Sequence, residues 1–184
     1  MMREALYQPS CYGCPHDVHY QDAVPMRTCG VMMHCGERYC TGGKRARRFK
    51  HGDPQSHVPK WCPKRKNPCE LRIYALKSLE DWGLHDLLSE GLGELLSPAA
   101  SRYALRFDGT IELTPQEFWK RCAQEPAADL LPIPIQLYEV LEIDDGLGSA
   151  FFYKGRTDLR VVSDFDAERA RKNIMEDSCG PSCE

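Results

Sequence analysis

The sequence predicts an α+β protein in which a small Cys-rich zinc module precedes an antiparallel sheet with two to four helices. Three observations lead to this prediction. Cysteine, histidine and positive charge gather in the first 75 of the 184 residues. Beyond residue 69, short runs alternate apolar and polar residues as strands do, and two capping-box signatures each begin a helical pattern. Strands joined by short turns favour α+β over a parallel α/β fold.

The two parts of the chain carry opposite charge. Residues 1–75 hold 13 Lys and Arg against 6 Asp and Glu, whereas residues 76–184 hold 11 against 21. Seven of the ten cysteines and five of the six histidines lie in the basic part. We therefore expect a basic N-terminal module over residues 1–69, an acidic body over 70–176 and a disordered tail over 177–184.

The composition excludes several classes of protein. Hydrophobic residues make up 42% of the chain and charged residues 28%, which excludes a disordered or collagen-like chain. No run approaches the roughly 20 apolar residues of a membrane-spanning helix, and the first ten residues lack the apolar core of a secretion signal. We therefore expect a cytoplasmic protein without membrane contact, whose cysteines bind metal rather than form disulfides.

The N-terminal module contains the motif Cys11-Tyr12-Gly13-Cys14, in which two thiolates two residues apart can hold one ion from a tight turn. The module is too poor in Leu, Ile and Val to form a stable core, so a structural Zn²⁺ would supply its folding energy. Cys40 precedes a Gly-Gly turn and Cys62 lies between prolines. We favour a zinc finger-like site formed by Cys11, Cys14, Cys40 and Cys62.

Other ligand sets stay open. The alternative ligands are Cys29, Cys69, His16 and His34. Cys29 and Cys69 replace one of the favoured four, or they form a second site with His34 or Cys35. The chain contains neither a His-Glu-x-x-His motif nor a deaminase signature, so we expect a structural zinc rather than a catalytic one.

The body elements follow in chain order. Residues 70–77 alternate as a strand, and Ser78 begins a helical pattern that ends at Gly91 or Gly93. Residues 103–113 predict a hairpin that turns at Asp108-Gly109, the pair typical of a type I′ turn. Thr114-Pro115-Gln116-Glu117 then predicts a capped helix that stops before Pro126.

The remaining elements are strands and one helix. Residues 133–143 predict a strand that begins at a sheet edge because of Pro132 and Pro134. Residues 150–154 are expected to pair back on it, residues 159–163 to add another strand, and residues 166–175 to form the last helix. The carboxylates of Asp144, Asp145, Asp164 and Asp166 could belong to a metal or nuclease site. Turns and helix caps are the commoner roles of these patterns.

Two runs of basic residues, 44–51 and 60–66, lie next to the proposed ligands. Each run also contains an aromatic side chain, Phe49 in the first and Trp61 in the second. Such a composition suits contact with phosphates and stacking on bases, but Phe49 and Trp61 can equally form a small core of the module. The predicted nucleic-acid or partner contacts are Lys44, Arg45, Arg47, Arg48, Lys50, Lys64, Arg65 and Lys66.

The cysteine framework resembles one found in small proteins of Firmicutes phages and conjugative elements. The motifs that carry the resemblance are Cys11-x-x-Cys14-Pro15-His16, Tyr39-Cys40-Thr41-Gly42-Gly43-Lys44 and Trp61-Cys62-Pro63, within residues 11–74. The resemblance implies that Cys11, Cys14, Cys40 and Cys62 bind one metal ion together. Small mobile-element proteins of this kind include anti-CRISPR inhibitors of Cas nucleases.

Three functions follow as hypotheses. The first is a non-enzymatic, zinc-stabilised interaction protein that inhibits a nucleic-acid-handling enzyme, with a Cas nuclease or another nucleoprotein as its protein partner. Its acidic body would occupy a cationic channel of that enzyme. The second is a sequence-tolerant DNA- or RNA-binding protein that uses the basic module. The third is a zinc-containing nuclease with His51 or His57 as its base.

Overall fold

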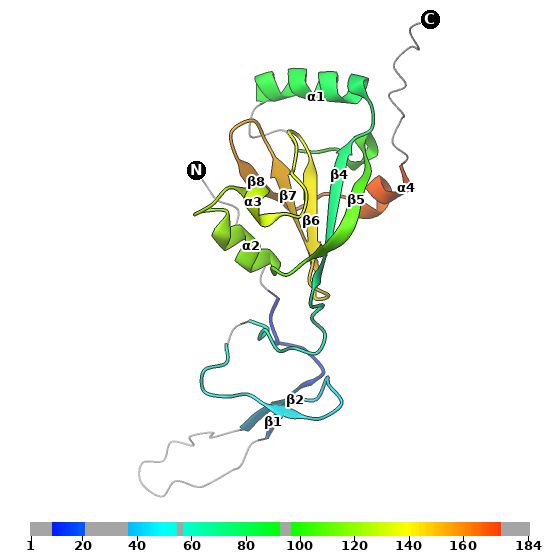
Figure 1. Ribbon diagram of the computed structural model, residues 1–184. Helices are drawn as coiled ribbons and strands as arrows, with labels where there is room; N and C mark the ends of the chain where they lie inside the picture. Colours follow the sequence, from blue (N-terminus) through cyan, green and yellow to red (C-terminus); the bar gives the residue numbers. More distant parts are fainter. Residues whose placement is uncertain (1–8, 21–36, 55–56, 93–96, 174–184) are drawn as a thin grey trace, which may run out of the picture. The chain divides into compact units, whose positions relative to one another are not determined.

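The computed structural model describes residues 9–20, 37–54, 57–92 and 97–173 (Figure 1). Within these residues the fold is α+β, with a three-stranded and a five-stranded antiparallel sheet and four α-helices. The chain divides into two compact units, with the boundary between Arg65 and Lys66 in the sequence. The described residues 9–65 of the N-terminal module form one unit, and residues 66–69, which we expected in that module, belong with the body in the other. The expected tail over 177–184 lies outside the described residues.

The N-terminal module forms a small sheet. Its strands are β1 (Asp17–Tyr20), β2 (Glu37–Cys40) and β3 (Arg47–Arg48), in that spatial order. The residue pattern does not predict these strands, because Gly, Pro and Cys interrupt any alternation of apolar and polar positions. Antiparallel pairing forms these strands although the local pattern does not favour them. Asp17 lies opposite Cys40, and Tyr39 lies opposite Arg48.

The body is a five-stranded antiparallel sheet with the spatial order β5-β4-β6-β7-β8. Its strands are β4 (Cys69–Leu76), β5 (Tyr103–Ile111), β6 (Val140–Asp144), β7 (Ser149–Lys154) and β8 (Leu159–Val162). Its helices are α1 (Leu79–Leu92), the 3-10 turn η2 (Ala100–Arg102), α2 (Pro115–Arg121), α3 (Ala127–Leu130) and α4 (Ala167–Lys172). The prediction of an antiparallel sheet with two to four helices is confirmed.

Both faces of the body sheet are covered. On one face, Phe118 of α2 packs against Phe152 of β7 with their ring centroids 5.1 Å apart. On the other face, Ala167 and Ala170 of α4 join a core of tyrosines that includes Tyr74. The largest fully buried side chains all lie in the body, and nearly all of them come from the strands and from α2. Burial of these side chains is the main source of stability for this unit.

The predicted hairpin over 103–113 is wrong. Residues 103–111 form one strand, β5, which pairs with β4 from Tyr103 to Ile111. The ring of Phe107 lies over Gly109, because a Cβ placed on Gly109 would come within 2.6 Å of Phe107 Cζ. Glycine therefore makes room for a ring along a strand rather than a positive φ in a turn. The long β4 strand supplies hydrogen-bond partners on both sides of Asp108, which overrides the local turn signal.

The strand predicted over 133–143 is too long. Only Val140–Asp144 is strand, and Tyr138 has a φ of +67°, a left-handed conformation that no strand contains. The Tyr138 ring contacts His85 and Trp82 of α1, and its backbone N–H donates to the Lys154 carbonyl at 2.7 Å. These contacts fix a turn before β6.

The other local signals are confirmed. Thr114 and Glu117 form a complete capping box at the start of α2. Ser78 Oγ accepts a hydrogen bond from Asp81 N at 3.1 Å, so α1 begins where the capping pattern places it. Asp166 accepts from Arg169 N and caps α4, which is the structural role rather than the catalytic one. No helix among the described residues is long and apolar enough to cross a membrane.

Candidate functional site

The Cys11–Cys14 motif forms the turn that its spacing predicts. Cys14 N–H donates to the Cys11 carbonyl at 2.9 Å, and Gly13 has a φ of +76°. A left-handed residue at this position favours glycine, because any other side chain would be strained there. The turn continues into β1 through a hydrogen bond from Asp17 N to the Cys14 carbonyl at 3.0 Å. The two thiols therefore lie on one short, hydrogen-bonded segment.

Pairing of β1 with β2 brings Cys40 to this segment. Cys40 lies opposite Asp17 in the sheet, and Thr41 N–H donates to the His16 carbonyl at 2.9 Å. His16 is half-buried, and its Cγ would lie 3.4 Å from a Cβ on Gly42. The third candidate ligand thus follows from strand register, 26 residues beyond Cys14 in sequence.

Cys62 reaches the same region by two contacts. Val58 N–H donates to the Pro9 carbonyl at 2.9 Å, so the Cys62 segment begins beside the one that leads into Cys11. Pro63 lies against the Gly42 turn, where its Cγ would be 3.4 Å from an added Cβ. A turn holds Cys62 itself, since its N–H donates to the Pro59 carbonyl at 3.1 Å. The four favoured cysteines therefore lie on three segments that contact one another.

The electrostatic surroundings of Cys11 involve the neighbouring thiols and one cation. Burial raises the pKa of the Cys11 thiol, Arg38 acts to lower it, and charge on Cys62 and Cys14 raises it further. Arg38 also donates two hydrogen bonds to the Asp17 carboxylate, at 2.8 and 2.9 Å. Arg38 therefore only partly offsets the effect of burial on the Cys11 thiol, whose pKa stays above its usual value.

The segments that carry the four cysteines contact one another, but the described side chains form no metal-binding group. Among the described residues, no three or more His, Cys, Asp or Glu side chains are arranged to hold a metal ion. The six described cysteines are all free thiols. Cys69 belongs to β4 of the body, where it is buried and donates to the Lys66 carbonyl at 3.6 Å. Two of the alternative ligands, Cys29 and His34, lie outside the described residues.

The predicted basic contacts fall into two groups. Lys44, Arg45, Lys50 and Lys64 are exposed and form no ion pair with another described residue. The others are engaged within the protein. Arg48 pairs with Glu37 at 2.7 Å, Arg65 donates to the carbonyls of Val58 and Pro59, Arg47 lies over the Trp61 ring, and Lys66 pairs with Glu70 and Asp144 of the body.

Phe49 and Trp61 form the small core that the sequence left as an alternative to base stacking. Their ring centroids are 5.0 Å apart in an edge-on arrangement. Arg38 lies 4.1 Å from the Phe49 centroid, and Arg47 lies 4.3 Å from that of Trp61. The Trp61 indole N–H donates to Asp53 at 2.9 Å. Both rings are therefore packed by the protein's own cations.

Sequence reasoning missed an exposed aromatic residue. Tyr12 lies between the two cysteines of the turn and is 96% exposed. A large ring held out on a rigid turn can stack on a base or a partner side chain. The sequence held a signal for this exposure, because an aromatic residue inside a tight Cys-x-x-Cys turn has no core to enter.

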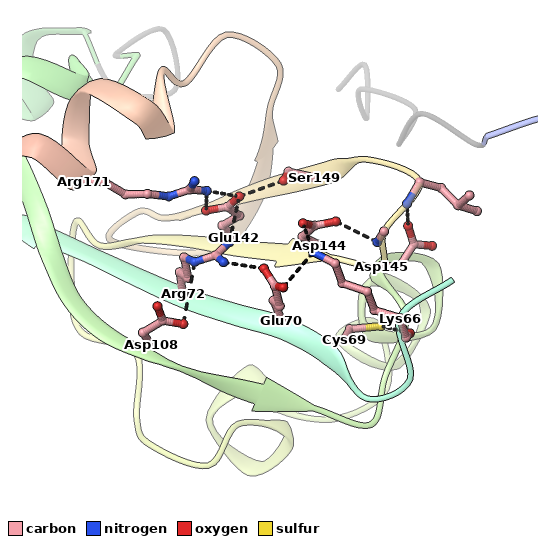
Figure 2. A network of polar contacts seen from close by, with 12 residues as sticks. Lys66, Cys69, Glu70, Arg72, Asp108, Glu142, Asp144, Asp145, Ser149 and Arg171 are labelled. Carbon is pink, nitrogen blue, oxygen red and sulfur yellow. Dashed lines mark hydrogen bonds and ion pairs between the residues drawn. The ribbon is translucent and has the colours of Figure 1, made fainter. Parts of the chain in front are cut away.

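The body contains a second polar cluster around a buried carboxylate (Figure 2). Glu142 is 1% exposed and accepts hydrogen bonds from Tyr74 at 2.5 Å, Ser149 at 2.7 Å and Arg171 at 2.7 and 2.8 Å. Burial by itself raises the pKa of Glu142, but these hydrogen bonds together hold it below its usual value. Arg72 lies beside this carboxylate and also pairs with Glu70.

The charged groups of this cluster form ion pairs with one another. Figure 2 shows Lys66 between Glu70 and Asp144, at 2.7 and 2.8 Å. Asp144 also accepts from Gly146 N, and Asp145 accepts from Leu147 N, as in a turn. The cluster lines an open hollow of about 570 Å³. Its carboxylates are neutralised by cations on neighbouring strands and on α4, so a structural role accounts for them.

Comparison with protein-family models, with curated proteins and with solved structures finds no match to this chain.

Proposed function

We propose that the N-terminal module binds one structural Zn²⁺ through Cys11, Cys14, Cys40 and Cys62. The observation that supports this proposal is the meeting of three cysteine-bearing segments through backbone hydrogen bonds and strand pairing. Four thiolates in a tetrahedron are a common ligand set for structural zinc. Ion binding would turn the half-buried thiols of Cys14, Cys40 and Cys62 toward Cys11.

The thin core of the module supports the same proposal. Among its described residues, Cys11 and Val58 are the buried apolar side chains besides Pro59. So small a core cannot offset the conformational entropy of ordering the segment. Structural zinc contributes about 10–16 kcal/mol to zinc-finger peptides, which is ample to order a unit of this size.

Metal analysis of the purified full chain tests the zinc site. We expect one zinc per chain in the wild type. Replacement of any of the four favoured cysteines by serine should reduce zinc below half of that, whereas Cys69→Ser and Cys122→Ser should retain it. Cys69 and Cys122 are matched controls because both are thiols of the body. A wild-type chain without bound metal, or four variants that all keep it, would contradict the proposal.

We further propose that this module binds the phosphate backbone of nucleic acid without reading its sequence. Residues 8–65 hold 10 Lys and Arg against 4 Asp and Glu. The described carboxylates are engaged, since Asp17 binds Arg38, Glu37 binds Arg48, and Asp53 accepts from Lys50 N and Trp61. The exposed cations Lys44, Arg45, Lys50 and Lys64 therefore keep their charge for a partner, and Tyr12 supplies an exposed ring in the same module.

Binding to labelled single- and double-stranded DNA at several salt concentrations tests this function. If four to five phosphates are neutralised, the logarithm of affinity for duplex DNA should fall with the logarithm of salt at a slope of about −4. The triple change Lys44→Glu, Arg45→Glu and Lys64→Glu should weaken binding by about 100-fold or more. A matched triple change in the body, Lys120→Glu, Arg169→Glu and Lys172→Glu, should leave binding within about threefold.

The zinc site and the nucleic-acid contact can fail separately. If the Lys/Arg variants bind DNA as the wild type does, the polyanion proposal is wrong while metal analysis still decides the zinc site. If the chain binds zinc and no nucleic acid, the cations serve another partner.

The inhibitor hypothesis stays a prediction and is favoured by one observation. Residues 66–184 carry 13 Lys and Arg against 22 Asp and Glu, a surplus of carboxylates suited to a cationic channel. Adding the purified chain to a guide-loaded Cas nuclease should slow target cleavage. Unchanged cleavage at a large excess of the chain would remove this hypothesis. The nuclease alternative predicts DNA cleavage by the chain itself that is lost on His51→Ala or His57→Ala.

A further inference from the structure

Helix α1 places its polar side toward the body sheet. His85 is 2% exposed, and its Nε2 lies 2.7 Å from the Tyr153 hydroxyl. The Tyr138 hydroxyl donates to Asp86 at 2.5 Å and lies 2.9 Å from Ser89 Oγ. Figure 1 shows α1 crossing over one end of the sheet, so this polar side is the one that anchors it.

The outward side of α1 is apolar. Leu79 is 78% exposed, Leu87 is 65% exposed and Leu84 is 44% exposed. A surface helix normally buries its leucines and turns its polar residues to water. This reversal leaves a continuous apolar stripe without a partner among the described residues. Exposed stripes of this kind mark sites of association.

Two glycines, Gly83 and Gly91, interrupt the same stripe. Among the described residues, a Cβ added to either glycine would meet no atom within 4 Å. Glycine inside a helix is destabilising relative to alanine, and neither residue has a positive φ that would require glycine. Packing among the described residues therefore does not explain these glycines, whereas close approach of another molecule would.

The stripe is complementary to itself. Leu79, Gly83, Leu87 and Gly91 recur every four residues, so they form one row on the helix surface. If a second α1 lies antiparallel across a two-fold axis centred between Gly83 and Leu87, each leucine meets a glycine of the partner helix. Rows at this spacing interdigitate when helices cross at about −50°. The flanking carboxylates Glu80 and Glu90 lie on opposite sides of the row, so the symmetry does not place them against each other.

We propose that α1 is the contact surface of a symmetric dimer, in which leucines of one copy fill the glycine gaps of the other. The partner is a second copy of this chain, because one row contains both the protruding leucines and the glycines that leave room for them. A 14-residue helix is about 21 Å long, so one helix pair buries less area than a standard dimer interface. The dimer is therefore weak, and its population depends on protein concentration.

Sedimentation velocity of the full chain over a range of concentrations tests the dimer. The wild type should shift from monomer to dimer as its concentration rises. Gly83→Leu places leucine against Leu87 of the partner, and Leu87→Gly leaves glycine against glycine. Each variant alone should weaken self-association by about tenfold or more. Leu137→Gly, which changes another exposed leucine of the body, should leave it unchanged.

Mixing the two variants gives the decisive result. In a mixed pair, the new leucine at 83 meets the new glycine at 87, and Leu87 meets Gly83, so dimers should return to wild-type levels. Circular dichroism of each variant confirms that it is folded. A wild type that stays monomeric at every concentration overturns the proposal, as does a folded mixture that does not associate. Either result would indicate that the apolar stripe of α1 contacts a different protein or a lipid surface rather than a second copy of this chain.

Discussion

Glu142 shows how a single buried charge is held in this protein. The carboxylate lies on the central strand β6 and receives hydrogen bonds from Tyr74, Ser149 and Arg171. A carboxylate that is removed from water must regain its solvation from such donors, otherwise its charge is costly. Tyr74 and Arg171 lie 68 and 29 residues away, so no local pattern in the sequence indicates this site.

Arg171→Met should destabilise the body by about 2 kcal/mol, because Glu142 would keep its charge and lose the guanidinium nitrogen that donates to both of its oxygens. Adding Glu142→Gln to that variant should recover part of the loss, since the neutral amide removes the uncompensated charge. Urea unfolding followed by circular dichroism measures both changes. Arg169→Met, on the exposed side of α4, is the control and should change the free energy of unfolding by less than about 0.5 kcal/mol. Additive losses in the double variant would show that the two groups do not act as a pair.

Residue-scale prediction from sequence succeeded where the signal is local. The turn at Asp144-Asp145-Gly146 and the cap at Asp166 both follow from side chains that bond backbone groups two or three residues away. The four favoured cysteines were chosen by spacing and flanking residues. Tertiary contacts bring them together: the strand register, the hydrogen bond from Val58 N to the Pro9 carbonyl and the contact of Pro63 with the Gly42 turn.

At the scale of elements, α1 depends on His85 for its attachment to the sheet. The ring packs against Tyr138 and Tyr103, and Arg102 and Arg160 lie near enough to disfavour its charge. Burial, followed by these two cations, lowers the pKa of His85 to about 4, although Asp86 acts in the opposite direction. His85 is therefore neutral in the folded protein well below the pH at which it protonates when unfolded.

The stability of α1 should therefore decline in acid. Since the pKa of His85 is about 6.5 unfolded and about 4 folded, its contribution is complete above pH 6.5 and is lost as the pH falls toward 4. The loss amounts to at most about 3 kcal/mol. His85→Gln removes this titration, so the difference in unfolding free energy between wild type and variant should shrink from pH 7 to pH 4.5. A difference that stays constant with pH would contradict the buried neutral histidine.

The strand β5 shows why one element was mispredicted. An Asp-Gly pair between alternating runs is a strong turn signal, because it favours positive φ at two adjacent residues. In the folded body, the Phe107 ring lies across Gly109 and β4 offers a continuous ladder of hydrogen bonds. The pairing partner decides between hairpin and strand here, and that partner lies more than 30 residues earlier in sequence.

At the scale of the whole molecule, the two compact units should respond differently to metal removal. A chelator such as EDTA should abolish the hydrogen-exchange protection of β1 and β2, because the proposed zinc supplies the folding energy of the module. Protection of β4 through β8 should not change, because apolar burial stabilises the body. Mass-spectrometric exchange on the full chain measures both. Equal loss of protection in the two units would show that they fold as one, and no loss in either would argue against a structural metal.

The sequence by itself determined the split between a basic cysteine-rich part and an acidic part, the caps of α1 and α2, and most strands of the body. These features depend on composition, periodicity and side-chain bonds that reach only a few residues. The tertiary structure alone decided the strands of the module, the continuity of β5, the pairing of Glu142 with Arg171 and the reversed orientation of α1. Each of these depends on partners tens of residues apart, whose hydrogen bonds and burial outweigh local preference.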